Sequence, residues 1–106
     1  MAYEKMTEKE KEVISEIKNY LDITYEDEDS DRKLYTIMKN GMERISNISG
    51  KELDFTEAGV HKELLLEYCR YGRGNMLEFF ERNFRQKIMQ LLTEGEIQNY
   101  AESGNV

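Results

Sequence analysis

The chain has 106 residues and no proline, and this absence limits its possible folds more than any other feature. Proline is the commonest helix breaker, because it lacks a backbone N–H and clashes with the preceding turn. Apolar side chains also recur at spacings of three and four along most of the chain, as they do on one face of a helix. The sequence therefore predicts an all-α protein, a small bundle of about four helices.

The first predicted helix begins at a capping box. Thr7 is followed three residues later by Glu10, so each side chain can accept a hydrogen bond from a free backbone N–H of the first turn. The apolar stripe that follows consists of Val13, Ile14, Ile17 and Leu21. We expect this helix to end near Leu21, where the periodicity stops.

A dense acidic segment, defined as Glu26, Asp27, Glu28, Asp29 and Asp31, precedes the second predicted helix. Negative charge favours the positive end of a helix dipole, and we expect Asp29, Ser30 or Asp31 to cap the helix. Its apolar stripe contains Gly41, which allows a neighbouring backbone to approach closely, and Gly50 provides a left-handed stop.

Residues 51–59 are predicted to form an extended loop in which Leu53 and Phe55 point into the core. A third helix is expected from about Val60 to Tyr71, interrupted by glycines at 72 and 74. Asn75 is then expected to cap a last helix that Gly95 ends. Whether residues 60–93 form two helices or one kinked helix stays open. We predict one domain over residues 1–93 and a flexible tail over residues 94–106.

Charge is unevenly spread along the chain, which carries 15 basic and 22 acidic residues for a net charge of −7. Residues 1–59 have nine basic and fifteen acidic side chains, residues 60–93 have six and four, and the remainder adds three acids. The acidic excess argues against duplex binding through a broad basic face. No apolar stretch is long enough to span a membrane, and no signal peptide is recognisable, so we expect an intracellular protein.

The sequence contains no complete catalytic or metal-binding pattern. Asp27, Asp29 and Asp31 alternate like the first ligands of a calcium loop, but Arg32 and Met38 stand where that loop needs glycine and a bidentate acid. The single histidine, His61, and the single cysteine, Cys69, are eight residues apart, which separates their backbones by about 12 Å in a helix. We therefore predict no enzyme and no cofactor, with a Cys69 nucleophile as a minor alternative.

Four arginines lie within sixteen positions of one another, between residues 70 and 85. This arginine set is Arg70, Arg73, Arg82 and Arg85, and tyrosines flank the first of them. Arginine and tyrosine are enriched where proteins contact partners. The set is therefore either a partner-contact surface or the edge of the core, with tyrosine rings packed inside and arginine heads in solvent.

Two stretches resemble a known family. One runs from Ile17–Ile23 (IKNYLDI) through the acidic segment to Ile48–Gly50, and the other comprises Glu63–Tyr71 (ELLLEYCRY), Asn75 and Phe79–Phe84. Together they resemble the small head–tail connector (head completion) proteins of long-tailed bacteriophages and of prophages, over roughly residues 7–93. The resemblance implies a helical subunit that assembles into a ring, typically twelve-fold, beneath the portal protein. It implies no catalysis and no cofactor.

The same resemblance suggests partners and a location. Such a ring extends the channel for passing DNA, without sequence-specific binding, and docks the next connector, stopper or tail protein. It assembles in the bacterial host cytoplasm and remains at the head–tail junction of the virion. The acidic segment would then face the channel or a neighbouring subunit, and the arginine set would meet an acidic neighbour. The alternative is an acidic helical adaptor or DNA mimic that sequesters a basic partner.

Overall fold

The computed structural model describes residues 5–103, with side chains described as far as Ile97, and these residues form helices and loops. In chain order the elements are α1 (Glu8–Tyr20), α2 (Glu28–Ser49), α3 (Val60–Arg73), the short 3-10 helix η2 (Leu77–Phe79), α4 (Phe80–Asn83) and α5 (Arg85–Ser103). The predicted all-α class is confirmed, although the last predicted helix is divided into three pieces.

Helix α1 begins as its capping box predicted. The Thr7 hydroxyl accepts from the Glu10 backbone N–H at 3.1 Å, and the Glu10 carboxylate accepts from the Thr7 N–H at 3.0 Å. The helix ends at Tyr20, and Leu21 caps it.

Helix α2 begins one residue after Asp27, which is its cap. The Asp27 carboxylate accepts from the Ser30 backbone N–H at 2.9 Å, so the expectation that Asp29, Ser30 or Asp31 would cap this helix is wrong. Gly50 ends α2 with a φ of 80°, as predicted. At Gly41 a Cβ would lie 2.7 Å from Tyr68 Cδ1, so α3 approaches this glycine with side chains rather than with its backbone.

The chain between α3 and α5 turns differently from the prediction. Helix α3 continues through Gly72 to Arg73 and is capped by Gly74. Asn75 has a left-handed φ of 57° and caps no helix, because η2 begins only at Leu77 and has no side-chain cap. Residues 60–93 thus form separate helices, α3 and α5, joined by the short turns η2 and α4.

Helix α5 extends beyond its predicted end. Gly95 lies inside α5 and is buried, and a Cβ there would meet the Ser49 carbonyl oxygen at 2.2 Å. This glycine is therefore a contact point between α5 and α2, and the prediction that it ends the helix is wrong. Of the predicted tail over residues 94–106, α5 takes in residues up to Ser103, and residues 104–106 lie outside the described residues. Its flexibility stays a prediction.

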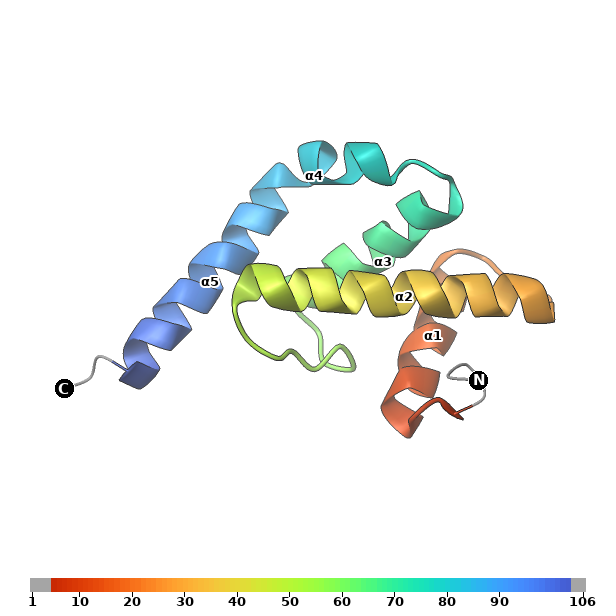
Figure 1. Ribbon diagram of the computed structural model, residues 1–106, viewed down its shortest axis with the longest axis horizontal. Coiled ribbons are helices and arrows are strands. Elements are labelled where there is room, and N and C mark those ends of the chain that lie inside the picture. The colour runs from red at the N-terminus through yellow and green to blue at the C-terminus, as the bar shows by residue number, and fades with distance from the viewer. Residues whose placement is uncertain (1–4, 104–106) are drawn as a thin grey trace.

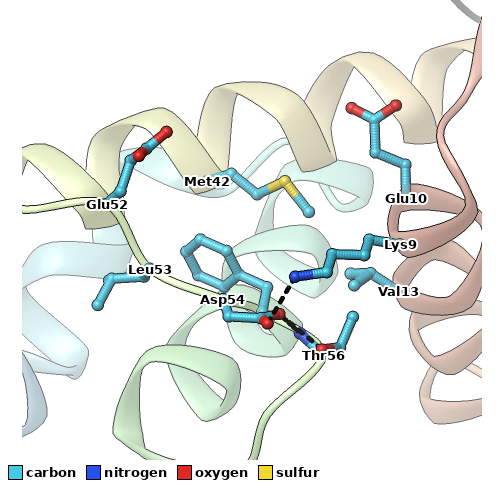
Figure 2. Close-up of a pocket in the computed structure, with 9 residues that line it drawn as sticks. Lys9, Glu10, Val13, Met42, Glu52, Leu53, Asp54 and Thr56 are labelled. Atoms are coloured by element: carbon cyan, nitrogen blue, oxygen red, sulfur yellow. Dashed lines mark hydrogen bonds and ion pairs between the residues drawn. The ribbon is translucent and has the colours of Figure 1, made fainter.

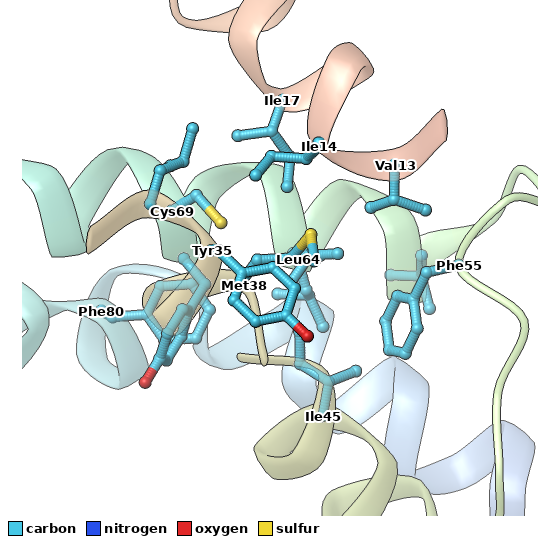
Figure 3. Close-up of a cluster of buried hydrophobic side chains, with 14 of the residues drawn as sticks. Val13, Ile14, Ile17, Tyr35, Met38, Ile45, Phe55, Leu64, Cys69 and Phe80 are labelled. Atoms are coloured by element: carbon cyan, nitrogen blue, oxygen red, sulfur yellow. The ribbon is translucent and has the colours of Figure 1, made fainter. Parts of the chain in front are cut away.

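The core lies where α1, α3 and α5 meet α2. Figure 1 shows α2 as the long central helix, with α1 and α5 packed at different places along it. Figure 3 shows side chains from α1, α2, α3 and the 51–59 loop converging in one cluster, including Ile17, Met38, Phe55 and Leu64. Phe55 is buried and Leu53 half-buried, which confirms that this loop contributes to the core.

The subunit is elongated. Its principal extents are 52 × 30 × 21 Å, and its radius of gyration is 14.8 Å. A compact chain of this length is expected near 13 Å. Helix α5, which extends away from the bundle toward the C-terminus in Figure 1, contributes to this length and leaves part of its surface without neighbours from the same chain.

Candidate functional site

The structure divides the acidic segment into engaged and free carboxylates. Asp31 is only 8% exposed and faces α1, where Lys18 Nζ lies 2.8 Å from Asp31 Oδ1. Asp27 caps α2, and its hydrogen bond from the Ser30 backbone N–H lowers its pKa. Glu28 pairs with Arg32 one turn later at 2.7 Å. Three of the five predicted surface acids therefore have structural roles.

Glu26 and Asp29 are the two remaining acids. Both are exposed, and neither has a hydrogen-bond or ion-pair partner among the described residues. Tyr25, which directly precedes them, is 52% exposed. We call Tyr25, Glu26 and Asp29 the acidic tip. It lies at the start of α2, at one extreme of the long axis in Figure 1.

The arginine set divides in the same way. Arg70 donates to the buried carboxylate of Glu67, which also accepts from the Tyr20 hydroxyl, so these three side chains tie α1 to α3. Arg73 donates to the Tyr25 hydroxyl at 3.2 Å. Both arginines are exposed, and the Arg73 guanidinium holds the loop before α2 against the end of α3.

Arg82 and Arg85 are less constrained. Arg82 lies over the Phe79 ring at 5.3 Å from its centroid, and Arg85 begins α5. Both are exposed, and neither has an ion-pair partner in the described part of the chain. The four predicted residues thus form two pairs with different surroundings.

The tyrosines beside Arg70 belong to the core. Tyr68 is buried and meets the Phe80 ring edge-on at 5.3 Å, while the half-buried Tyr71 contacts Phe84 at 5.5 Å. For these two rings the core-edge interpretation is correct. The exposed aromatic rings near these arginines come from a segment more than forty residues earlier: Tyr25 accepts from Arg73, and Tyr20 shares the Glu67 carboxylate with Arg70.

Helix α5 exposes two large apolar side chains that the sequence analysis did not select. Met89 is 52% exposed and Ile97 is 65% exposed, whereas Leu91 and Gly95 are buried against the bundle. Helix α5 is consequently apolar on more than one side. A sequence signal was present, because Met89 and Ile97 do not fit the stripe of Phe84, Ile88 and Leu91.

A groove with a volume of about 400 Å³ lies between α1, α2 and the 51–59 loop (Figure 2). Val13, Met42 and Phe55 line it, and Lys9 crosses its edge to reach Asp54 at 2.8 Å. Asp54 also accepts from the backbone N–H and the hydroxyl of Thr56. The hydrogen bond from Lys9 and those from Thr56 hold the Asp54 pKa well below its usual value. Asp54 thus fastens α1 to the loop.

Cys69 and His61 have structural surroundings. Cys69 is fully buried, and burial raises the pKa of its thiol to about 12. This environment disfavours the thiolate that the minor alternative of a Cys69 nucleophile would need. His61 is half-buried, with Nε2 2.8 Å from the Asp54 carbonyl oxygen. Within the described residues no group of three potential metal ligands is found, and Asp31 pairs with Lys18.

Comparison with known proteins adds no family. No protein-family model, curated protein or solved structure matches the chain. Among the described residues, no helix combines the length and apolar character that a membrane span needs.

Proposed function

We propose that this protein is a structural assembly subunit, a phage head–tail connector that forms a ring beneath the portal. The observation that supports the proposal best is the projecting α5, which leaves Met89 and Ile97 exposed on a subunit 52 Å long. Contact with a neighbouring protein would remove this apolar surface from water, which favours association.

The family resemblance specifies the assembly. In this proposal the ring, expected to be twelve-fold, extends the DNA channel from the portal and docks the next connector, stopper or tail protein. Its copies assemble in the host cytoplasm and persist at the head–tail junction. The residues that carry the resemblance, such as Ile17, Tyr68 and Phe80, lie in the buried cluster and support the shared helical framework rather than a reaction.

The net charge fits a DNA conduit. The chain carries a net charge of −7, and carboxylates repel phosphates over a screening length of about 8–10 Å. A channel wall with this charge would let DNA pass without holding it. The protein itself would contribute walls and contact surfaces, with no cofactor.

The test is assembly on a portal. The purified protein is mixed with isolated portal rings from the same phage or prophage and viewed by negative-stain microscopy, with light scattering for the protein alone. We expect closed rings with an axial channel, either alone or stacked on the portal. A protein that stays monomeric or dimeric and leaves portal rings undecorated contradicts the proposal.

The second candidate is an acidic adaptor or DNA mimic. It is favoured by the net charge of −7 and by exposed acids at the start of α2. Such a module would bind a basic protein as a monomer or dimer and compete with DNA for it. Competition against duplex DNA for a basic DNA-binding protein, without ring formation, would favour this candidate over the connector.

A further inference from the structure

The start of α5 carries an exposed surface with both charged and apolar parts. Arg85 and Met89 are one helical turn apart and therefore lie on the same side of α5, and Arg82 lies just before them in α4. All three side chains are exposed. We call these residues the arginine–methionine face. It has the composition of an interface, since arginine and methionine are both enriched where proteins meet.

The acidic tip has a composition that complements the arginine–methionine face. Glu26 and Asp29 supply free negative charge, and Tyr25 supplies an exposed aromatic ring that is held in place by Arg73. Each surface thus combines two charges of one sign with one exposed large side chain. The charges are opposite, and methionine sulfur packs favourably against aromatic rings.

One copy cannot bring these surfaces together. The acidic tip lies at the N-terminal end of α2, at the right-hand extreme of Figure 1, whereas α5 lies in the left half. Their neighbours within the chain also differ: the tip contacts the end of α3 through Arg73, and α5 contacts α2 through Gly95 and Ser49. The two surfaces can therefore meet only when they belong to different copies.

We propose that the partner of the arginine–methionine face is the acidic tip of a second copy of this chain. Because the two surfaces lie at separate places on an elongated subunit, each copy offers them to two different neighbours, head to tail, and repeating this contact produces a closed ring when the rotation between copies closes. This inference rests on the proposed ring-forming function and assigns the surfaces that build the ring. It leaves α5 beyond Met89, including Ile97, available for a different contact.

Charge reversal tests the pairing directly. The tip variant is Glu26→Arg with Asp29→Arg, and the face variant is Arg82→Glu with Arg85→Glu. In the tip variant both surfaces are positive, and in the face variant both are negative. Each variant alone should therefore self-associate at least about tenfold more weakly than the wild type, measured by sedimentation velocity at low ionic strength.

Rescue distinguishes pairing from misfolding. An equimolar mixture of the two variants restores opposite charges at every contact of an alternating assembly, because each reversed surface meets a reversed one and each native surface meets a native one. The variant with all four substitutions also has opposite charges on its two surfaces. We expect both preparations to recover association, and circular dichroism should show native helix content throughout.

The matched control carries the same charge change elsewhere. Glu12→Arg with Glu43→Arg reverses two exposed acids that belong to neither surface and have no partner among the described residues. Its association should be at least that of the wild type. Met89→Ser, which keeps the charges, should weaken association without lowering the urea midpoint, because Met89 is exposed in the single subunit.

The outcomes separate this inference from the proposed function. The same variants are compared in solution and on isolated portal rings. Rings that tolerate either reversal, or reversals that the mixture and the fourfold variant fail to rescue, overturn the pairing and leave the connector proposal standing.

Charge-dependent association without portal binding supports the pairing and counts against a connector. A wild-type protein that is monomeric both in solution and with portal overturns both. Loss of DNA binding in the face variant, with association unchanged, would instead assign Arg82 and Arg85 to DNA.

Discussion

Helices α1 and α5 both pack against α2 and α3, but they differ in what surrounds the rest of their surfaces. Polar side chains of α1 have partners in other elements, whereas α5 leaves large apolar side chains exposed. Helix α1 buries Val13, Ile14 and Ile17, and polar side chains along its edges reach other elements. These cross-element contacts are Lys9–Asp54, Glu10–Lys39, Glu16–Lys62, Lys18–Asp31 and Tyr20–Glu67. Every side of α1 that faces the protein is therefore matched by a partner in the same chain.

Among its described residues, helix α5 buries fewer side chains than α1 does. Leu91 is buried, Gly95 touches the end of α2, and Lys87 pairs with Glu63 of α3 at 2.7 Å. On its other sides α5 exposes Met89 and Ile97. The comparison indicates that α1 is complete within the monomer, whereas α5 has a second surface suited to a neighbour.

The largest effect is expected in the core side of α1. Ile17→Ala should lower the free energy of unfolding by about 4 kcal/mol, because Ile17 is fully buried and its removal leaves a cavity. Met89→Ala in α5 should change it by less than about 0.5 kcal/mol, because that side chain is exposed. Urea unfolding followed by circular dichroism measures both. Equal losses would mean that α5 is as fully packed as α1.

The contact between α5 and α2 depends on Gly95, which has no side chain. Gly95→Ala should destabilise the protein by about 2 kcal/mol, because the new Cβ would meet the Ser49 carbonyl oxygen at 2.2 Å and push α5 from α2. The matched control is Gly74→Ala, whose Cβ would meet its nearest atom at 3.6 Å. That control should stay within about 0.5 kcal/mol of the wild type. A neutral or stabilising Gly95→Ala would contradict this contact.

The ion pairs along the edge of α1 should contribute less to the free energy of unfolding than its buried side chains do. Lys18→Met removes the cation that faces the buried Asp31 carboxylate, and we expect a loss of about 1–2 kcal/mol in unfolding free energy. Lys11→Met is the comparison, since Lys11 and Glu8 form an exposed pair of little energetic value. Urea midpoints of the two variants should differ clearly. Identical midpoints would show that the Lys18–Asp31 pair does not secure α1.

The smallest effect is a pH dependence of α1 docking. Hydrogen bonds from Lys9 and Thr56 hold the Asp54 pKa below its usual value of 3.8. This stabilisation is fully present above pH 3.8 and is lost as the pH falls below it, because the unfolded carboxyl takes up a proton first. Asp54→Asn should therefore flatten the acid side of the curve of urea midpoint against pH. An unchanged acid limb would show that this carboxylate does not couple α1 docking to pH.

Features set by near neighbours in the chain were predictable. The capping box at Thr7, the left-handed stop at Gly50 and the three helical stripes through Ile17, Met38 and Leu64 all follow from residues within a few positions of one another. The core role of Phe55 also followed from an apolar residue in a polar loop. Cap choice was predicted less well, because Asp27, Asp29, Ser30 and Asp31 all have side chains that can cap a helix.

Predictions failed where a distant residue decided the outcome. Gly95 resembles a helix stop, but it lies within α5 because the backbone at Ser49 approaches it. Asp31 resembles a surface acid, but Lys18 draws it inward. Asn75 is a local exception: it takes a left-handed φ in the turn that ends α3, and η2 begins only at Leu77.

The sequence by itself determined the all-α class, the helical stripes and the net charge of −7, because these depend on composition and on contacts within a turn or two. Only the tertiary structure decided which charges are free. Glu26, Asp29, Arg82 and Arg85 remain available, whereas Asp31 and Arg73 are engaged by Lys18 and Tyr25. The physical reason is that ion pairs and hydrogen bonds between helices require partners brought together by folding, and the Arg73–Tyr25 contact spans 48 positions of the chain.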